Sequence, residues 1–411
     1  MKFDVIIPSL LVSPAWFADA NPPRLPALES LLLRGGVTHG NAWPQCALDC
    51  FGCSAGVAAL SALGDGIEVG NHGWMFAEPA HFQADRDTVN LLPRARLAIS
   101  DAEALSLIAA LNTNFADRGL VFVRGDSGQW YVQCETSELP ETTPIHIARG
   151  GNLFDKLPRS RGKLSWKAIQ NEAQMLLFAD PVNAAREGVG TLTINGLWFW
   201  GEPLVPAEVE SQPKVLEMSY DGLDSGLRRN DGLLEALGDA RRRVTVVPAE
   251  AGTQSVVTHF ESDVLNTGLR RDDDSIAKIK PNPSIGAVFG DISLAKGLAA
   301  WSLLPFSPMH ELAIHQPPAA HSVVITDSLS AHLDRGDLAA WREALAAMEA
   351  NLFVPLLRAL REATIDELVL TLPRDHDALV STIHAASFRG ARGWWNNLRK
   401  PPRPFLEYPL A

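Results

Sequence analysis

Two polar side chains, Asn183 and Arg186, lie three residues apart where the chain is expected to turn into an apolar strand at 191–199. A planar guanidinium in such a place can bind a phosphate or a carboxylate through two parallel hydrogen bonds. These residues could therefore contact an anionic ligand. The alternative is a surface ion pair of Arg186 with Glu187 or Asp180, which is the commoner role of an arginine.

Three cysteines, Cys46, Cys50 and Cys53, form a CxxxCxxC pattern. Three thiolates at this spacing could ligate three irons of a [4Fe–4S] cluster, and the spacing resembles the iron–sulfur loop of radical S-adenosylmethionine enzymes. The glycine-glutamate-proline segment of that family has a counterpart at 201–203, but about 150 residues downstream of Cys53. Cysteine also packs as a small apolar residue, and the three positions share one helical face. We therefore favour core packing, with an iron–sulfur radical enzyme as the alternative.

The composition excludes several classes of protein. The chain has 411 residues, of which 46% are hydrophobic and 20% charged, as in a soluble globular protein. Its net charge of −12 provides no general attraction to nucleic acid or to an anionic membrane, so neither is expected as a partner. The sequence shows no signal peptide and no apolar run long enough for a transmembrane helix. Four cysteines do not make a disulfide scaffold, and a cytoplasmic location is expected.

Strands that alternate with helices must position the polar residues. Short apolar runs predict strands at 2–7, 120–123, 129–134, 191–199, 285–289, 322–326 and 367–372, and apolar periodicity predicts helices at 24–34, 100–118, 165–178 and 337–362. This alternation indicates an α/β fold with a mostly parallel sheet and helices on both faces. Pro355 is expected to kink the last helix. A C-terminal hairpin precedes a Trp- and Arg-rich tail, which could stack on single-stranded nucleic acid but more often packs on the core.

The stretch 215–280 departs from this pattern, because its periodicity fades and turn residues and charges dominate. Residues 224–231 recur as 266–273, and a single pair of repeats cannot build a solenoid. We therefore predict one α/β domain from 1–214 and 281–411, interrupted by a surface insertion of low order at 215–280.

Several blocks of sequence, weak alone, occur in a recognisable order. They are Asp180-Pro181-Val182-Asn183 with Arg186, Asn195 and Gly201, the segment 21–35, and Gly286–Phe289 with 294–297. In this order they resemble archaeal-type cofactor-independent phosphoglycerate mutases of the alkaline phosphatase superfamily. Segments 58–66, 197–201 and 394–403 resemble proteobacterial proteins labelled phosphoglycerate mutase or RpfE-type regulatory protein. The resemblance implies an alkaline-phosphatase-like core, and a small phosphorylated ligand near Asn183 and Arg186.

Active members of the resembled family use two divalent metals and a serine nucleophile. Their first metal-binding aspartate follows the first strand, where this chain has Pro8 and Ser9. Their nucleophile corresponds to Ala55, which has no hydroxyl; the neighbouring Ser54 is the candidate nucleophile, with Ser9 as a second. The resemblance therefore implies a catalytic site that lacks two of its parts.

Five later residues resemble the metal ligands of that family. They are Asp327, His332, Asp375, His376 and His384. Carboxylate and imidazole ligands of this kind would suit manganese or zinc. The alternative is structural: Glu367–Leu372 and Leu379–Ala385 could pair as the hairpin, with residues 374–377 as its polar turn.

These observations predict a phosphoglycerate-mutase-like protein that is degenerate at the catalytic site and has a regulatory or ligand-binding role. The alternative is an active metal-dependent cofactor-independent phosphoglycerate mutase, or a phosphatase acting on small phosphate esters.

Overall fold

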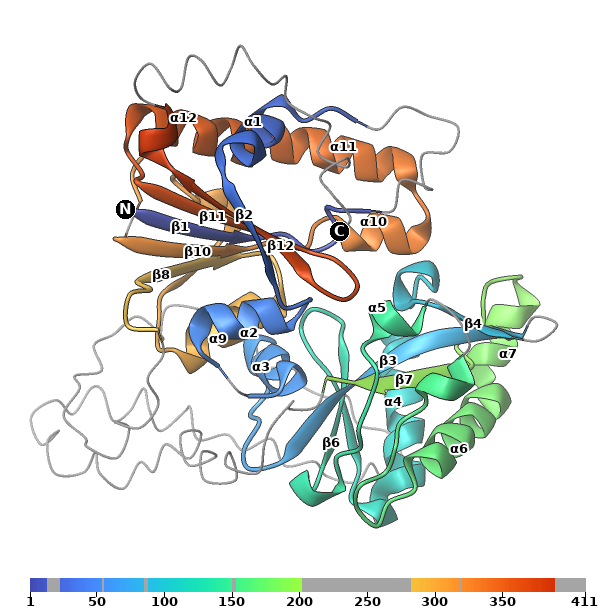
Figure 1. Ribbon diagram of the computed structural model, residues 1–411. Coiled ribbons are helices and arrows are strands. Elements are labelled where there is room, and N and C mark those ends of the chain that lie inside the picture. The colour runs from blue at the N-terminus through green and yellow to red at the C-terminus, as the bar shows by residue number, and fades with distance from the viewer. Residues whose placement is uncertain are drawn as a thin grey trace, which may run out of the picture. The chain divides into compact units, whose positions relative to one another are not determined.

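Two β-sheets with their helices make up the described part of the chain (Figure 1). The computed structural model describes residues 1–12, 23–53, 55–84, 88–149, 153–201, 282–317 and 319–388. The predicted insertion at 215–280, the Trp- and Arg-rich tail and Ser54 lie outside these residues. No helix in the described part is long and apolar enough to cross a membrane.

The larger sheet contains the predicted parallel strands. Its members are β1 (Lys2–Ile6), β2 (Gly36–Gly40), β8 (Ala287–Gly290), β9 (Phe306–Pro308), β10 (His321–Ile325), β11 (Glu367–Pro373) and β12 (Ala378–His384). They are arranged in the order β2-β12-β11-β1-β10-β8-β9, and only β12 runs in the opposite direction, antiparallel to both β11 and β2. The ends of β1, β8, β10 and β11 therefore meet at one edge, here named the carboxyl edge, and their starts form the opposite, amino edge.

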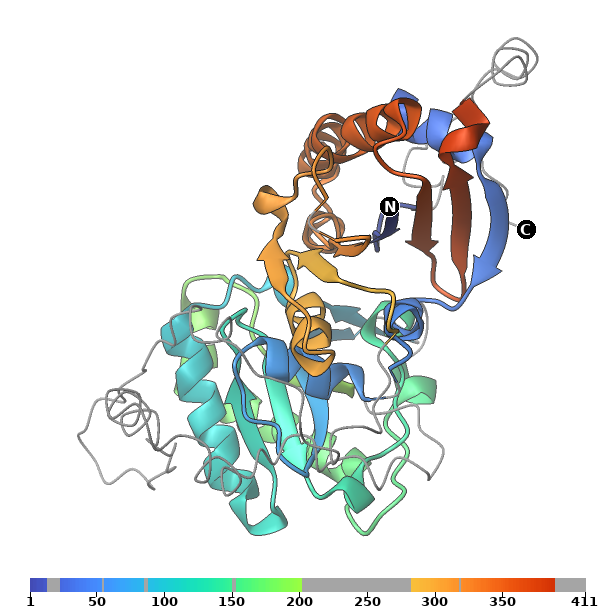
Figure 2. The ribbon, with the colours of Figure 1, turned by 90° about the vertical axis from the view of Figure 1, so that its left-hand side faces the viewer.

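Helices α1 (Pro26–Arg34), α11 (Leu338–Met348) and α12 (Val354–Glu362) cover one face of this sheet (Figures 1 and 2). Trp341 and Leu356 from these helices are buried with Phe3 of β1 in one apolar core. The helix predicted at 337–362 is present, but a π-helical turn at Glu349–Phe353 separates α11 from α12. The wider turn lies just before Pro355, whose missing N–H and bulky ring disfavour a regular helix there.

The other face of the sheet is covered by α2 (Gln45–Phe51), α3 (Val57–Gly64) and α9 (Ser293–Trp301). Helices α3 and α9 cross at two glycines. A Cβ atom on Gly297 would lie 1.7 Å from the carbonyl oxygen of Leu60, and one on Gly64 would lie 1.9 Å from that of Ser293. Only glycine permits this approach, which holds the start of α9 beside the carboxyl end of β8.

A second sheet is entirely antiparallel, which corrects the expectation of one mostly parallel sheet. Its strands are β3 (Gly73–Ala84), β4 (Val89–Leu92), β5 (Val121–Arg124), β6 (Trp130–Cys134) and β7 (Gly196–Trp200). The strands β5 and β6 correspond to those predicted at 120–123 and 129–134 and pair with each other. The sequence pattern does not predict β3, which joins the sheet by pairing with β4, β6 and β7. Helices α4 (Asp101–Phe115), α6 (Trp166–Ala179) and α7 (Pro181–Gly188) cover one face (Figure 1).

Local capping signals determine where several helices begin. A capping box precedes α4: Ser100 accepts a hydrogen bond from the amide of Glu103, whose carboxylate accepts one from the amide of Ser100. The side chain of Ser165 also caps its helix, α6, by accepting a hydrogen bond from the amide of Ala168.

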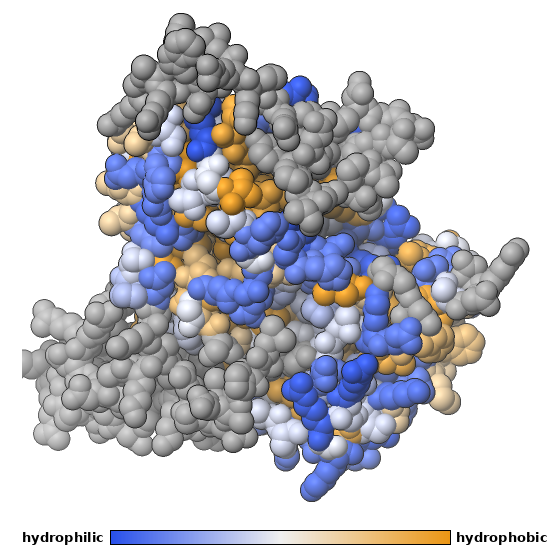
Figure 3. Space-filling view, in the orientation of Figure 1, coloured by the Kyte–Doolittle hydropathy of each residue, from blue (hydrophilic) through white to orange (hydrophobic). Residues whose placement is uncertain are grey.

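Two short helices, α5 (Ile145–Ala148) and α10 (Ser330–Arg335), complete the part of the fold that matters for the site. Over the coloured surface in Figure 3, hydrophobic residues occur in small groups among hydrophilic ones.

Candidate functional site

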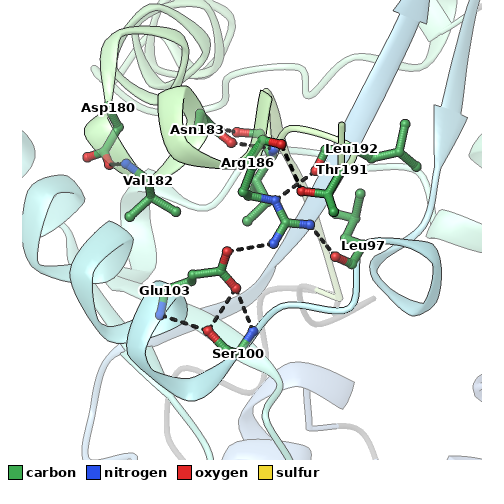
Figure 4. A network of polar contacts seen from close by, with 10 residues as sticks. Leu97, Ser100, Glu103, Asp180, Val182, Asn183, Arg186, Thr191 and Leu192 are labelled. Atoms are coloured by element: carbon green, nitrogen blue, oxygen red, sulfur yellow. Dashed lines mark hydrogen bonds and ion pairs between the residues drawn. The ribbon is translucent and has the colours of Figure 1, made fainter. Parts of the chain in front are cut away.

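Asn183 and Arg186 lie in α7, and every polar group of their side chains contacts the protein itself (Figure 4). The guanidinium of Arg186 is buried; its Nε donates to the carbonyl of Leu192 at 2.7 Å, and its two Nη atoms donate to Glu103 at 2.8 Å and to the carbonyl of Leu97. The Asn183 amide donates to the carbonyls of Leu177 and Ile194 and accepts from the amide of Ile194, each at 2.7 Å. Neither side chain is therefore presented to a ligand, and the surface pair with Glu187 or Asp180 is not formed either: Asp180 caps α7 instead.

The three cysteines of the CxxxCxxC pattern lie in and just after α2, with Cys46 and Cys53 buried in the apolar core beneath the sheet. Burial raises the pKa of the Cys46 and Cys53 thiols to about 12 and raises that of Cys50 as well. Within the described residues, no three side chains of His, Cys, Asp or Glu, these cysteines included, are grouped so that they could hold a metal ion. The geometry therefore supports the packing role and not the iron–sulfur alternative.

The five residues that resemble metal ligands are not brought together. Asp327 follows β10, His332 lies in α10, and Asp375 and His376 form the turn between β11 and β12, all at the carboxyl edge. His384 ends β12, opposite Glu367 in the antiparallel pair, and therefore lies at the amino edge, 3.5 Å from the Glu367 carboxylate. The predicted hairpin with its turn at 374–377 is present.

The residues present do not fit the two metals that the resemblance implies. Within the described ranges, no three side chains of His, Cys, Asp or Glu are placed to hold a metal ion. Ser9, which stands after β1 where an aspartate would be expected, adopts a left-handed backbone conformation with φ of 61° and carries a hydroxyl instead of a carboxylate. The candidate nucleophile Ser54 lies outside the described residues, so the structure does not test its role.

A different set of ionisable residues does converge at the carboxyl edge. Asp291 follows β8 and accepts hydrogen bonds from the Thr326 hydroxyl at 2.6 Å and from the Asp327 amide at 3.0 Å. Oδ1 of Asp327 is buried and has no hydrogen-bond partner. Burial, assisted by the negative charges of Asp291 and Asp334, raises the pKa of the Asp327 carboxyl to about 7. Asp327 is consequently part protonated at neutral pH.

Arg149, just after α5, extends this set towards the turn between β11 and β12. It forms a two-pronged ion pair with Asp334 of α10, in which one contact is 3.2 Å long, and its Nε is buried without a partner. Nε2 of His146, on α5, is also buried and unpartnered, and burial lowers the pKa of this imidazole to about 4. The charges of Asp375, Arg149 and His376 act on His146, so these residues face one region. We name Asp291, Asp327, Asp334, Arg149 and His146 the carboxyl-edge site.

A cavity of about 240 Å³ adjoins this site at Asp291. Its lining comprises Gly64, Asp65, Asp126, Gly290, Asp291, Ile292, Ser293, Lys296 and Phe306. Asp65 is buried there and accepts hydrogen bonds from the hydroxyls of Ser127 at 2.6 Å, Tyr131 at 2.8 Å and Ser293 at 2.5 Å. The Asp65 carboxylate therefore links the end of α3 to α9, to β6 and to the β5–β6 turn by hydrogen bonds. Lys296, in contrast, is exposed and its ammonium group is accessible to a ligand.

Sequence reasoning missed His146, Arg149, Asp291 and Lys296. A signal existed for two of them, because Asp291 and Lys296 flank the start of the helix that follows a recognisable glycine-containing strand, and ligands of α/β sheets bind outside the carboxyl ends of strands. No motif marks His146 or Arg149. Their partners lie on α10 and the β11–β12 turn, far along the chain, so only the folded structure brings them together.

No protein-family model matches the chain, and no curated protein matches it either. Two solved structures are similar to it at 12% sequence identity. One is the cofactor-independent phosphoglycerate mutase from Thermoplasma acidophilum DSM 1728, aligned over 93% of this chain and 89% of that one with a TM-score of 0.36. The other is the PH0037 protein from Pyrococcus horikoshii, aligned over 93% and 87% with a TM-score of 0.42. Both TM-scores are low, so neither alignment assigns an activity to this chain.

Proposed function

We propose that the chain is a phosphoglycerate-mutase-like protein, of the kind labelled RpfE-type regulatory protein, that binds a small phosphorylated ligand and transfers no phosphoryl group. The observation that carries the proposal is the carboxyl-edge site, where Asp327 Oδ1, Arg149 Nε and His146 Nε2 are buried without hydrogen-bond partners. Buried polar atoms in folded proteins are nearly always paired. A ligand bound at this edge is one source of hydrogen-bond partners for these atoms.

Three guanidinium groups at the site could bind an anionic ligand. Arg149, Arg335 and Arg94 all act on Asp334, in a site that also contains the carboxyls of Asp291 and Asp327. The part-protonated Asp327 can donate its proton to a phosphate oxygen, and the Arg149 Nε–H is free to donate as well. Exposed Lys296 at the adjoining cavity adds a further positive charge.

The same residues argue against metal-assisted phosphoryl transfer. That reaction requires two cations held by several carboxylates and imidazoles around an in-line nucleophile. Here the carboxylate of Asp334 is already paired with Arg149, and His384 lies at the amino edge of the sheet. Ser9 stands where the resembled family has an aspartate. A binding role is therefore the better explanation of this site.

Binding and turnover can be measured separately with 3-phosphoglycerate. We expect calorimetric titration without metal to detect binding, and Arg149→Lys to weaken it at least about tenfold, because lysine lacks the Nε donor and the planar fork. Arg161→Lys is the matched control, since Arg161 is exposed and its ion pair among the described residues is a long one with Glu141, at 3.9 Å. Mutase turnover with added manganese should be absent. Turnover that Asp327→Asn abolishes would support the metal-dependent enzyme instead, and equal affinities in Arg149→Lys and wild type would remove the proposed binding site.

A further inference from the structure

A serine, a histidine and an aspartate form a chain of hydrogen bonds at the amino edge of the larger sheet. His321 begins β10, and its Cα pairs with that of Lys2 in β1. Asp4 lies two residues further along β1 and therefore on the same face of the sheet as Lys2. The imidazole spans the two strands, with Nε2 2.8 Å from Oδ2 of Asp4 and Nδ1 2.9 Å from the hydroxyl of Ser284, on the turn before β8.

Two of the three residues are buried, and the serine lies at the surface. Asp4 is 8% exposed and His321 4% exposed, whereas Ser284 is exposed to solvent. Around Asp4, the Cys50 thiol donates to Oδ2 at 3.6 Å and Nζ of Lys2 lies 3.3 Å from Oδ1. Lys2 also approaches Glu367, at 3.4 Å. A buried carboxylate is thus held in place behind the imidazole, with its charge compensated.

This arrangement fixes the tautomer of His321. A carboxylate can only accept, so the ring nitrogen facing Asp4, Nε2, carries the proton, and Nδ1 is left as an acceptor towards Ser284. The amide oxygen of Asn282, 2.7 Å from the Ser284 hydroxyl, holds the turn and is a second acceptor for it. When the hydroxyl points to Nδ1, its proton can pass to the imidazole as the oxygen attacks an electrophile.

We propose that Ser284, His321 and Asp4 form a nucleophilic relay at the amino edge, separate from the carboxyl-edge site, that accepts acyl groups from small unhindered esters. Ser284 Oγ forms a bond to the ester carbonyl carbon while its proton moves to His321 Nδ1. The carbon–oxygen bond to the alcohol breaks, and the alcohol leaves with that proton. Water, deprotonated by the same imidazole, then releases the carboxylic acid and restores the serine. The substrate class follows from the exposed position of Ser284, which small acyl donors reach directly from solvent.

The decisive experiment uses a fluorophosphonate probe on the full-length protein, followed by peptide mass spectrometry. The probe replaces its fluoride by the oxygen of an activated serine, with loss of the hydroxyl proton to the base. We expect an adduct at Ser284 and none at Ser137, an exposed serine in the turn Thr136–Glu138 that serves as the control within the same chain. We further expect His321→Gln to slow labelling about 100-fold or more, and Asp4→Asn to slow it roughly tenfold or more.

The wild-type comparison remains decisive even where a buried variant fails to fold, because Ser284 and Ser137 are measured in one sample. Hydrolysis of p-nitrophenyl acetate that Ser284→Ala removes would establish the acyl-transfer step. Equal labelling of Ser284 and Ser137, or labelling unaffected in a folded His321→Gln protein, would overturn the proposal.

Discussion

Replacement of Asp327 by asparagine should change the pH dependence of stability in a defined direction. The folded state raises the carboxyl pKa from 3.8 to about 7, since Oδ1 is buried without a partner and Asp291 and Asp334 lie nearby. A group with a raised folded pKa contributes its full stability below the unfolded value and loses that contribution as pH rises through the folded value. Three pKa units correspond to roughly 4 kcal/mol. The wild type should therefore lose up to that much between pH 4 and about 7 from this group alone.

Asparagine keeps the size of the side chain but has no charge to bury. The unfolding free energy of Asp327→Asn should match the wild type within about 1 kcal/mol near pH 4.5 and exceed it by up to roughly 4 kcal/mol at pH 8. Urea denaturation at both pH values measures the difference, with Asp155→Asn as the control, since Asp155 is exposed in the turn Leu153–Lys156. A difference between Asp327→Asn and wild type that stays constant with pH would refute the reasoning, because a buried ionisable carboxyl is its only source.

Three further predictions test other parts of the structure. His146→Gln should protect against acid, because the imidazole pKa is lowered to about 4 and the wild type loses up to about 3 kcal/mol as pH falls from 6.5 to 4; an unchanged acid transition in urea titrations would contradict this. Gly297→Ala should cost at least about 2 kcal/mol, since its Cβ would meet the backbone of Leu60, whereas Gly188→Ala, with open space around it, should stabilise by about 0.5 kcal/mol. Equal melting temperatures for the two would argue against the tight crossing of α3 and α9. Arg186→Lys should lower the unfolding free energy by roughly 2 kcal/mol, because the acceptors of the guanidinium lose their donors. Calorimetry should show its affinity for 3-phosphoglycerate unchanged, and a weakened affinity would return Arg186 to the binding site.

Local signals in the sequence predicted much of the helical structure and the central parallel strands. The capping box at Ser100 and Glu103 is of this kind, because both partners lie within one turn and depend on nothing else in the fold. The C-terminal hairpin is another, since its turn at 374–377 joins two apolar strands directly.

What the sequence did not reveal depends on contacts between distant residues. Arg186 was expected to contact a ligand or a neighbour in sequence, yet its carboxylate partner is Glu103, 83 positions away. The strand β3 contains Pro79 and pairs with three strands at once, so its pattern of apolar residues does not alternate as in a simple surface strand. His384 was grouped with Asp375 and His376 by closeness in sequence, but one antiparallel strand is long enough to carry it to the opposite edge of the sheet.

The two ends of the segment between Gly201 and Asn282 are fixed to neighbouring parts of the chain. The carbonyl of Gly201 accepts a hydrogen bond from the amide of Ala58, and the amide of Asn282 donates to the carbonyl of Phe51. Both ends are thus attached within one short stretch around α2 and α3. The entropy of closing a loop grows only slowly with its length when its ends are already held in place. We therefore expect that a fluorescent reporter or a conditionally folding domain inserted in place of residues 202–281 would leave the folding of the two sheets unchanged.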